Sequence, residues 1–321
     1  MSAPAAKVFD ATILGRIGYD LYSEEPGVPL PRVRRFSRYL GGSSANMAVG
    51  LARLGARVGI AACLGTDSLS DFLVEFLERE GVDTSCVKRV EGALPSLCLT
   101  EVSPPDRFPQ VFYRHDPADV HVDLGERELE YLASGRMFIT NGTSLCASPS
   151  RESTYGAMER CRSAGCRVVM DADYRAMSWR SAAEAGLAVR LALPMVDVLI
   201  GNDVELKLAA GAETLEEAVE KLRPRVPLLV SKLGGLGTRA WSGGEAVFLP
   251  PYAVEVVSTI GAGDGFASGF LYALLEDRGV LEALHWGNAA AAIVVGRLSC
   301  SEAMPLRAEV EAMIASAASR R

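Results

Sequence analysis

The chain has 321 residues, of which 49% are apolar and 23% are charged, an ordinary balance for a folded globular protein and not for a disordered one. Its net charge of −7 provides no electrostatic footprint for nucleic acid. The seven scattered cysteines and three histidines follow no metal-ligand spacing, which indicates reduced thiols. Because residues 1–6 lack a basic leader and no uncharged window reaches about 18 residues, we expect a cytoplasmic protein with no membrane partner.

Along most of the chain, short strand-like runs alternate with helical stretches. The strand-like runs are 8–13, 58–64, 137–140, 167–171, 196–200 and 228–231. Helical periodicity covers 43–54, 70–80, 151–164, 182–192, 214–222, 263–275 and 283–295. The last two helices are rich in small residues, which is typical of two closely packed buried helices. Repeated strand–helix–strand units predict an α/β fold in which helices cover both faces of a mostly parallel sheet.

Two segments interrupt this alternation. Residues 15–40 contain three prolines and no clear helical pattern, and residues 94–122 hold two short apolar runs on either side of a turn at 103–106. This pattern predicts a small antiparallel patch beside the main sheet. Since no linker or repeat divides the chain, we expect residues 1–321 to form one domain, with these two segments as its appendage.

A glycine-rich turn, Gly261-Ala262-Gly263-Asp264, opens one of the predicted helices. Glycines let backbone N–H groups face an anion, and the helix N-terminus adds its positive end. Asp264 would then lie beside a bound phosphate, where it could accept a proton from a hydroxyl group. Phosphoryl transfer needs this combination of charge stabilisation and an oriented nucleophile. The alternative is a glycine turn with an N-capping aspartate. The glycine patterns of P-loop and dinucleotide-binding proteins are missing from the sequence.

The motifs around this turn stand in an order that is similar to one enzyme family. They are Gly-Arg-Ile-Gly-Tyr-Asp at 15–20, Gly-Gly-Ser-Ser-Ala-Asn at 41–46, Asn-Asp-Val-Glu at 202–205, Val-Ser-Lys-Leu-Gly-Gly-Leu-Gly at 230–237, and the turn at 261–264. Together they resemble the ribokinase-like, or PfkB-type, carbohydrate kinases over essentially the whole chain. The resemblance implies a three-layer sandwich with a small antiparallel lid, and ATP and Mg²⁺ as phosphoryl donor and cofactor.

The resemblance also implies roles for individual residues. Asp20, Gly41, Gly42 and Asn46 match positions that hold the sugar, and Asp and Asn side chains suit hydroxyl groups. Glu205 matches a position that holds Mg²⁺ through water, as suits a cation that keeps much of its hydration. The expected nucleotide side consists of Asn202, Glu205, Ser231, Lys232, Gly234, Gly237 and Asn288. In isolation, residues 202–205 are equally typical of a capped helix start, and Asn288 of a helix-surface or core asparagine.

Arginines near the expected sugar site indicate an acidic substrate. Arg114 lies in the second lid segment, and Arg175 follows Asp171 at the end of a predicted parallel strand. The planar guanidinium group binds a carboxylate through two hydrogen bonds, although either arginine could be a plain surface charge. With residues 18–22 and 36–46, these features resemble the subgroup that phosphorylates 5-dehydro-2-deoxygluconate in myo-inositol breakdown.

Other functions remain open at this stage. Kinases of 2-keto-3-deoxygluconate are the nearest alternative, followed by fructokinases and ribokinases, by nucleoside kinases, and by an inactive sugar-sensing protein of the same fold. Ser258 stands where many family members carry an acidic residue beside a monovalent cation, so dependence on K⁺ is an open question. Lid strands of this family often pair between subunits, and exposed strand edges favour such pairing, so we expect a homodimer.

Overall fold

The computed structural model describes residues 7–104 and 107–318, so the sequence-based expectations for residues 1–6 and for part of the turn at 103–106 lie outside the described residues. The strands are β1 (Phe9–Leu14), β2 (Gly18–Ser23), β3 (Phe36–Gly41), β4 (Val58–Gly65), β5 (Asp83–Val90), β6 (Ser96–Thr100), β7 (Gln110–Tyr113), β8 (Gly135–Asn141), β9 (Arg167–Asp171), β10 (Val198–Asn202), β11 (Leu228–Lys232), β12 (Thr238–Ser242) and β13 (Glu245–Leu249). The helices are α1 (Ser43–Leu54), α2 (Ser68–Arg79), α3 (Glu126–Ala133), α4 (Ser150–Ser163), α5 (Ala182–Ala192), α6 (Asp203–Ala210), α7 (Leu215–Leu222), α8 (Ala262–Leu275), α9 (Val280–Val295) and α10 (Arg307–Ala318).

The main sheet has the strand order β13-β12-β11-β10-β9-β8-β1-β4-β5 among the described residues. Every pair from β11 to β5 is parallel, whereas β11, β12 and β13 pair in antiparallel fashion. Alternate side chains of each strand enter opposite faces of the sheet. In β11, for example, Val230 packs in one core while Leu229 packs in the other. The expected mostly parallel sheet is confirmed.

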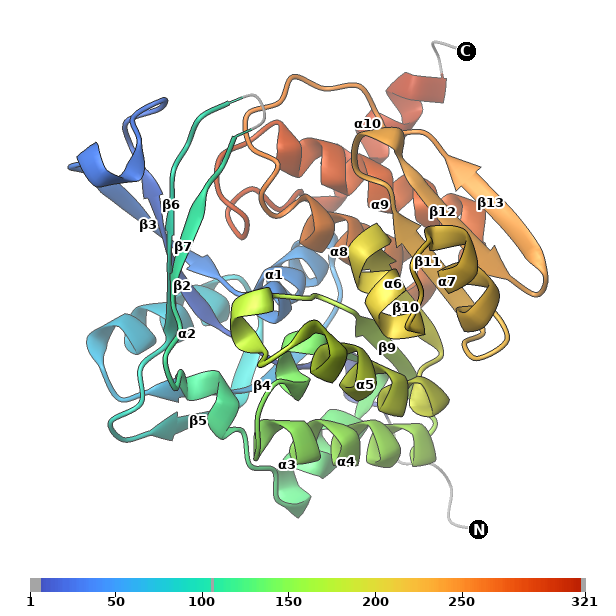
Figure 1. Ribbon diagram of the computed structural model, residues 1–321, viewed down its shortest axis with the longest axis horizontal. Coiled ribbons are helices and arrows are strands. Elements are labelled where there is room, and N and C mark those ends of the chain that lie inside the picture. Colours follow the sequence, from blue (N-terminus) through green and yellow to red (C-terminus); the bar gives the residue numbers. More distant parts are fainter. Residues whose placement is uncertain (1–6, 105–106, 319–321) are drawn as a thin grey trace.

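Helices cover both faces of this sheet and complete three layers (Figure 1). One core joins the sheet to α1, α2, α8, α9 and α10, and the second joins it to α3, α4, α5, α6 and α7. Helices α8 and α9 pack closely, as the small residues predicted. A Cβ atom at Gly269 would lie only 2.4 Å from the carbonyl oxygen of Trp286, so only glycine permits this approach. Within the described residues, no helix combines the length and apolar character that a membrane span requires.

A smaller sheet stands to one side of the three layers (Figure 1). Its strand order is β3-β2-β6-β7, and its strands come from the two segments that interrupt the alternation in the sequence. The predicted antiparallel pairing is confirmed for β6 with β7, and β2 with β3 is antiparallel too, but β2 and β6 at the centre of this sheet pair in parallel, with Gly18 opposite Ser96. Both strands follow a strand of the main sheet, β1 or β5, and leave it in the same direction.

Candidate active site

Several parallel strands of the main sheet end at one edge, and polar residues lie at those ends. The register places Asn141 at the end of β8 opposite Asp171 at the end of β9. It also places Asn202 at the end of β10 opposite Lys232 at the end of β11. Open α/β sheets bind ligands beyond the carboxyl ends of their strands. This edge therefore brings together four side chains from separate parts of the sequence.

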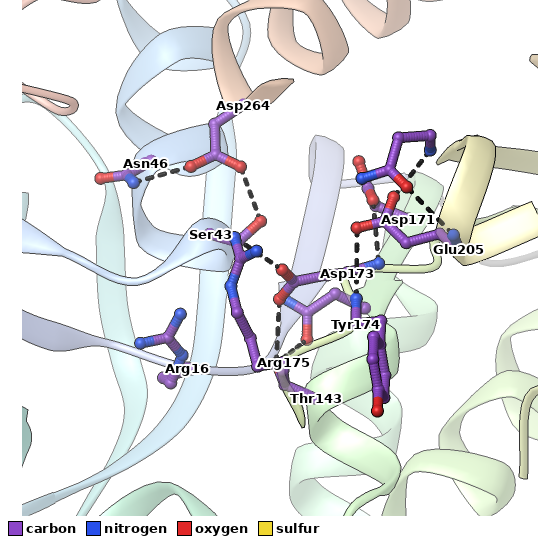
Figure 2. A network of polar contacts seen from close by, with 12 residues as sticks. Arg16, Ser43, Asn46, Thr143, Asp171, Asp173, Tyr174, Arg175, Glu205 and Asp264 are labelled. Carbon is purple, nitrogen blue, oxygen red and sulfur yellow. Dashed lines mark hydrogen bonds and ion pairs between the residues drawn. The ribbon is translucent and has the colours of Figure 1, made fainter. Parts of the chain in front are cut away.

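The predicted glycine turn leads into α8 at the same edge. Gly261 has a φ of 84°, and a Cβ atom there would lie 2.9 Å from the sulfur of Cys300, so glycine is required on both counts. Asp264 lies in the first turn of α8. Its carboxylate accepts hydrogen bonds from Ser43 Oγ at 2.7 Å and Asn46 Nδ2 at 2.8 Å, both on α1 (Figure 2).

Two carboxyl groups of the site have raised pKa values. Burial raises the pKa of Asp264 to about 6, although the hydrogen bonds from Asn46 and Ser43 oppose that shift. Burial likewise raises the pKa of Asp20 to about 6, with the charge of Arg16 opposing it and the charge of Asp264 adding to it. A carboxylate with a pKa near 6 is ionised at neutral pH and is a stronger base than an exposed aspartate.

Lys232 links the glycine turn to the acidic residues at the strand ends. Its ammonium group lies 2.8 Å from Asp171 Oδ2 and 3.9 Å from Glu205 Oε2. Burial acts to lower the pKa of Lys232, but the charges of Asp171 and Glu205 outweigh it and raise the pKa above its usual value. The same ammonium nitrogen lies 3.5 Å from the place that a Cβ atom at Gly263 would occupy. A fixed positive charge thus faces the helix N-terminus where an anion would bind.

Asn202 and Glu205 form a reciprocal cap at the start of α6. Asn202 Oδ1 accepts from the Glu205 amide at 3.0 Å, and Glu205 Oε2 accepts from the Asn202 amide at 2.8 Å. Glu205 Oε1 also accepts from the Tyr174 amide at 3.2 Å. Burial raises the pKa of Glu205, and Lys232 opposes that shift. The capping alternative is therefore confirmed, and the role of this pair toward a cation stays a prediction.

A cavity of about 430 Å³ opens beside the glycine turn. Its lining includes Lys232, Gly234, Gly237 and Asn288 from the expected nucleotide side, and Ala262 and Gly263 from the glycine turn. Asn288 is already used by the protein, because it accepts from Thr238 Oγ1 at 2.9 Å and donates to Pro250 O at 3.0 Å. Ser231 Oγ is buried and has no hydrogen-bond partner among the described residues. The cavity adjoins the turn that carries Asp264.

On the expected sugar side, the two glycines make room for protein groups. A Cβ atom at Gly41 would overlap the Asp20 carboxylate at 2.2 Å, and one at Gly42, whose φ is 92°, would lie 2.5 Å from Arg16 O. Asn46 donates to Asp264 through Nδ2, while its buried Oδ1 has no partner among the described residues. That oxygen is a free acceptor for a hydroxyl group.

Arg175 and Arg114, the two arginines singled out from the sequence, have different surroundings in the structure. Arg175 lies in the site, where its Nη2 is 3.0 Å from Asp173 Oδ1 (Figure 2). Arg114 forms a two-bond ion pair with Asp119, at 2.8 and 2.6 Å, and donates to Ser178 Oγ at 3.0 Å. A contact between Arg114 and a substrate stays a prediction, and it would require exchange of Asp119 for the substrate.

Three further residues of the site were not singled out from the sequence. Asp173, with a φ of 26°, accepts from Thr143 Oγ1 at 3.1 Å in addition to its ion pair. Burial acts to raise the pKa of Asp173, but the charges of Arg175, Arg16 and Lys232 hold that pKa below its usual value. Ser43 and Arg16 stand inside the motifs at 41–46 and 15–20, and that membership was the available clue.

Comparison with known proteins decides the family. The sequence model of the pfkB family carbohydrate kinases matches residues 8–307. The chain belongs to this family. A 5-dehydro-2-deoxygluconokinase of Clostridium tetani is 34% identical over 316 residues, which are 96% of this kinase and 93% of the relative. The crystal structure of a PfkB protein from Polaromonas sp. JS666 is 28% identical, with a TM-score of 0.84 over 95% of this kinase and 100% of that chain.

A second solved structure shares the fold of this kinase. It is a putative ribokinase II of E. coli in complex with ATP and Mg²⁺, with a TM-score of 0.86, 22% identity, and coverage of 96% of this kinase and 99% of that chain. The predicted ribokinase-like fold and carbohydrate kinase family are thus confirmed.

Proposed function

We propose that this kinase transfers the γ-phosphoryl group of ATP to a primary hydroxyl group of a keto sugar acid, 5-dehydro-2-deoxygluconate. The observation that most directly supports this proposal is the position of Asp264. It lies between the cavity beside the glycine turn and Asn46, whose Oδ1 is free to accept a hydrogen bond. The relatives that bear this activity in their names support the substrate, since identity of 34% extends over nearly the whole chain.

Asp264 acts as the general base. The Ser43 hydroxyl and the Asn46 amide hold its carboxylate in one orientation, and its pKa of about 6 leaves it ionised at neutral pH. It accepts the proton of the substrate hydroxyl as that oxygen attacks the γ-phosphorus in line. Backbone N–H groups of Ala262, Gly263 and Asp264, at the positive end of α8, stabilise the charge that develops on the phosphoryl oxygens.

The residues at the strand ends fit a nucleotide and a hydrated cation. The cavity of about 430 Å³ has the size of a small-molecule site, and Lys232 supplies a positive charge at the end nearest α8. Glu205 would hold Mg²⁺ through water, because two hydrogen bonds from backbone amides leave part of its acceptor capacity free. Bound Mg²⁺ would neutralise charge on the phosphates.

An ADP-release assay tests the substrate. We expect 5-dehydro-2-deoxygluconate to be turned over with the highest kcat/KM, ahead of 2-keto-3-deoxygluconate, fructose and ribose. A higher kcat/KM on 2-keto-3-deoxygluconate would move the enzyme to that alternative, and preference for a neutral sugar would overturn the sugar-acid assignment. Binding without ADP release for every sugar would indicate the inactive sugar-sensing protein.

We further propose that the rate does not depend on K⁺. Ser258 is buried, and its Oγ accepts from the Ile260 amide at 3.2 Å, so it offers no carboxylate to a cation. Replacing K⁺ by tetramethylammonium at equal ionic strength should change kcat by no more than about twofold, because a hard cation is held best by charged oxygen ligands. Activation by K⁺ well beyond that range would contradict the proposal.

We propose that this kinase works in the cytoplasm, where ATP is supplied, and that it forms a homodimer. The small sheet, which is the expected lid, supports the homodimer. Strands β3 and β7 form the two edges of the small sheet, and Val111 and Tyr113 on β7 are exposed. Such an edge favours pairing with a second copy. Light scattering should give a mass near twice 34.2 kDa, and a monomer at working concentration would contradict this arrangement.

A further inference from the structure

Arg16 is a buried arginine of the site to which no role has been given above. It follows β1 at the carboxyl edge of the main sheet and is 7% exposed. Its backbone position is fixed, because its carbonyl oxygen accepts from the Ala45 amide at 3.3 Å at the start of α1. The missing side chain of Gly42 allows this approach. The local backbone thus places the guanidinium group beneath the lid sheet, beside β6.

The guanidinium group of Arg16 lacks the partners that its burial demands. Its Nε is buried without a hydrogen-bond partner, and Nη1 reaches only Ser96 Oγ at 3.5 Å. In the part of the chain that the structure describes, no carboxylate forms an ion pair with it. Burying an unpaired charge costs several kcal/mol, so a stable fold normally pairs it. Arg114, whose side chain is 5% exposed, shows the usual solution, with both ends bound to Asp119.

Two carboxyl groups interact with the charge of Arg16 through space without a hydrogen bond to its guanidinium group. Asp173, whose pKa the charge of Arg16 helps to lower, is bound by Arg175 and Thr143. Asp20 is buried against Gly41, and its pKa is raised to about 6 although the charge of Arg16 opposes that shift. The N–H donors of Arg16 are therefore not used by any carboxylate among the described residues.

In the view of Figure 2, the side chains of Arg16 and Arg175 lie below those of Asp264 and Asn46. Neither Arg16 nor Arg175 lines the nucleotide cavity, so we do not expect a phosphate of ATP to be the partner of Arg16. A planar carboxylate matches the donor fork of a guanidinium group, which a sugar hydroxyl does not.

We propose that Arg16 binds the carboxylate of the sugar-acid substrate and thereby selects acids over neutral sugars. This inference rests on the proposed function and assigns its specificity to a particular residue. The carboxylate of an acid substrate accepts hydrogen bonds from these N–H donors, whereas a neutral sugar leaves them without a charged acceptor. Arg175, which already has Asp173 as partner, adds a second positive group on the other side of the same space.

The test compares Arg16→Met, Arg16→Lys and the control Arg53→Met, since Arg53 is also largely buried but is paired with Glu80 away from the site. Each variant is assayed with 5-dehydro-2-deoxygluconate and with the matching neutral sugar that has CH2OH in place of the carboxylate. Arg16→Met should lose about 30-fold or more in kcat/KM on the acid, as expected for a buried charge pair, and less than about threefold on the neutral sugar. Arg16→Lys should recover part of the loss.

A second readout separates binding from a structural role. The acid substrate should raise the Tm of the wild type more than the neutral sugar does, and Arg16→Met should abolish that difference while keeping a cooperative unfolding transition. Arg53→Met should have a lower Tm and an unchanged preference for the acid. Equal losses on the acid and the neutral sugar, or an unchanged difference between their Tm shifts in Arg16→Met, would overturn the role of Arg16 while leaving the proposed function intact. A wild-type enzyme inactive on every sugar acid would overturn both.

Discussion

Asp264 and Asn46 are 218 positions apart in the sequence, yet Asn46 Nδ2 donates a 2.8 Å hydrogen bond to the Asp264 carboxylate. The bond joins α1 to the first turn of α8 and therefore joins the expected sugar side to the glycine turn. It also leaves Asn46 Oδ1 free, so one asparagine can orient the base and bind a hydroxyl group at the same time. Substitutions of Asp264, Ser43, Lys232 and Arg175 test the roles proposed for this site.

Asp264→Asn should lower kcat by about a hundred- to ten-thousand-fold, the usual contribution of a general base. It should not lower stability at pH 8. The pKa of the carboxyl group rises from 3.8 to about 6 on folding, so its contribution to stability is full only well below 3.8 and is lost as the pH rises through 6. Removing the charge should therefore raise the unfolding free energy at pH 8 by about 1–3 kcal/mol.

Calorimetry at pH 8 and about pH 3, together with an ADP-release assay, checks this prediction. The gain in stability should nearly vanish at about pH 3, where the wild-type carboxyl group is largely protonated in both states. A variant that keeps near-normal kcat would remove Asp264 from the role of base.

Ser43→Ala should move the acid limb of the kcat/KM profile to higher pH. The Ser43 hydroxyl lowers the pKa of Asp264, so its loss raises that pKa above the value near 6. Activity at pH 6 should fall more than activity at pH 8. Ser85→Ala is the matched control, because Ser85 donates to Asp83 on the exposed strand β5. An acid limb that stays in place would argue that Asp264 does not set it.

Lys232→Gln should destabilise the protein by about 3 kcal/mol, because Asp171 and Glu205 would remain buried without their counter-charge. It should also raise the KM for ATP, since Lys232 faces the helix N-terminus at Gly263. Lys221→Gln removes an exposed pair with Glu217 and should cost less than about 0.5 kcal/mol. Urea titration of both variants checks the difference; equal small losses would mean that the Lys232 pair is already well solvated.

Arg175→Ala should lower kcat/KM for sugar acids more than for neutral sugars. The Arg175 side chain is 44% exposed and forms an ion pair with Asp173. We therefore expect kcat/KM on 5-dehydro-2-deoxygluconate to fall by about 10-fold, less than it falls in Arg16→Met. Steady-state kinetics on the acid and its neutral counterpart measure the ratio. If Arg175→Ala affects both sugars alike, its guanidinium group serves Asp173 and not the substrate.

Much of the fold follows from local patterns. The helices over 43–54 and 182–192 and the strand over 167–171 have the predicted bounds, because their apolar periodicity is unbroken between clear ends. The helices α3 and α10, the polar edge strand β5 and the hairpin of β12 and β13 were not predicted, and only the capped start of α6 was offered, as an alternative. A short or edge element buries few side chains, so its sequence carries a weak periodic signal.

The sequence by itself determined the parallel sheet, the glycine turn and the identity of the acidic and basic residues near it, because these depend on periodicity and on motifs within a few positions. Only the tertiary structure decided which of those residues are partnered. Arg114 and Arg16 are both buried, but Arg114 pairs with Asp119 and Arg16 pairs with no described carboxylate. Charge pairing depends on distances between segments that are far apart in the chain, and folding alone sets those distances.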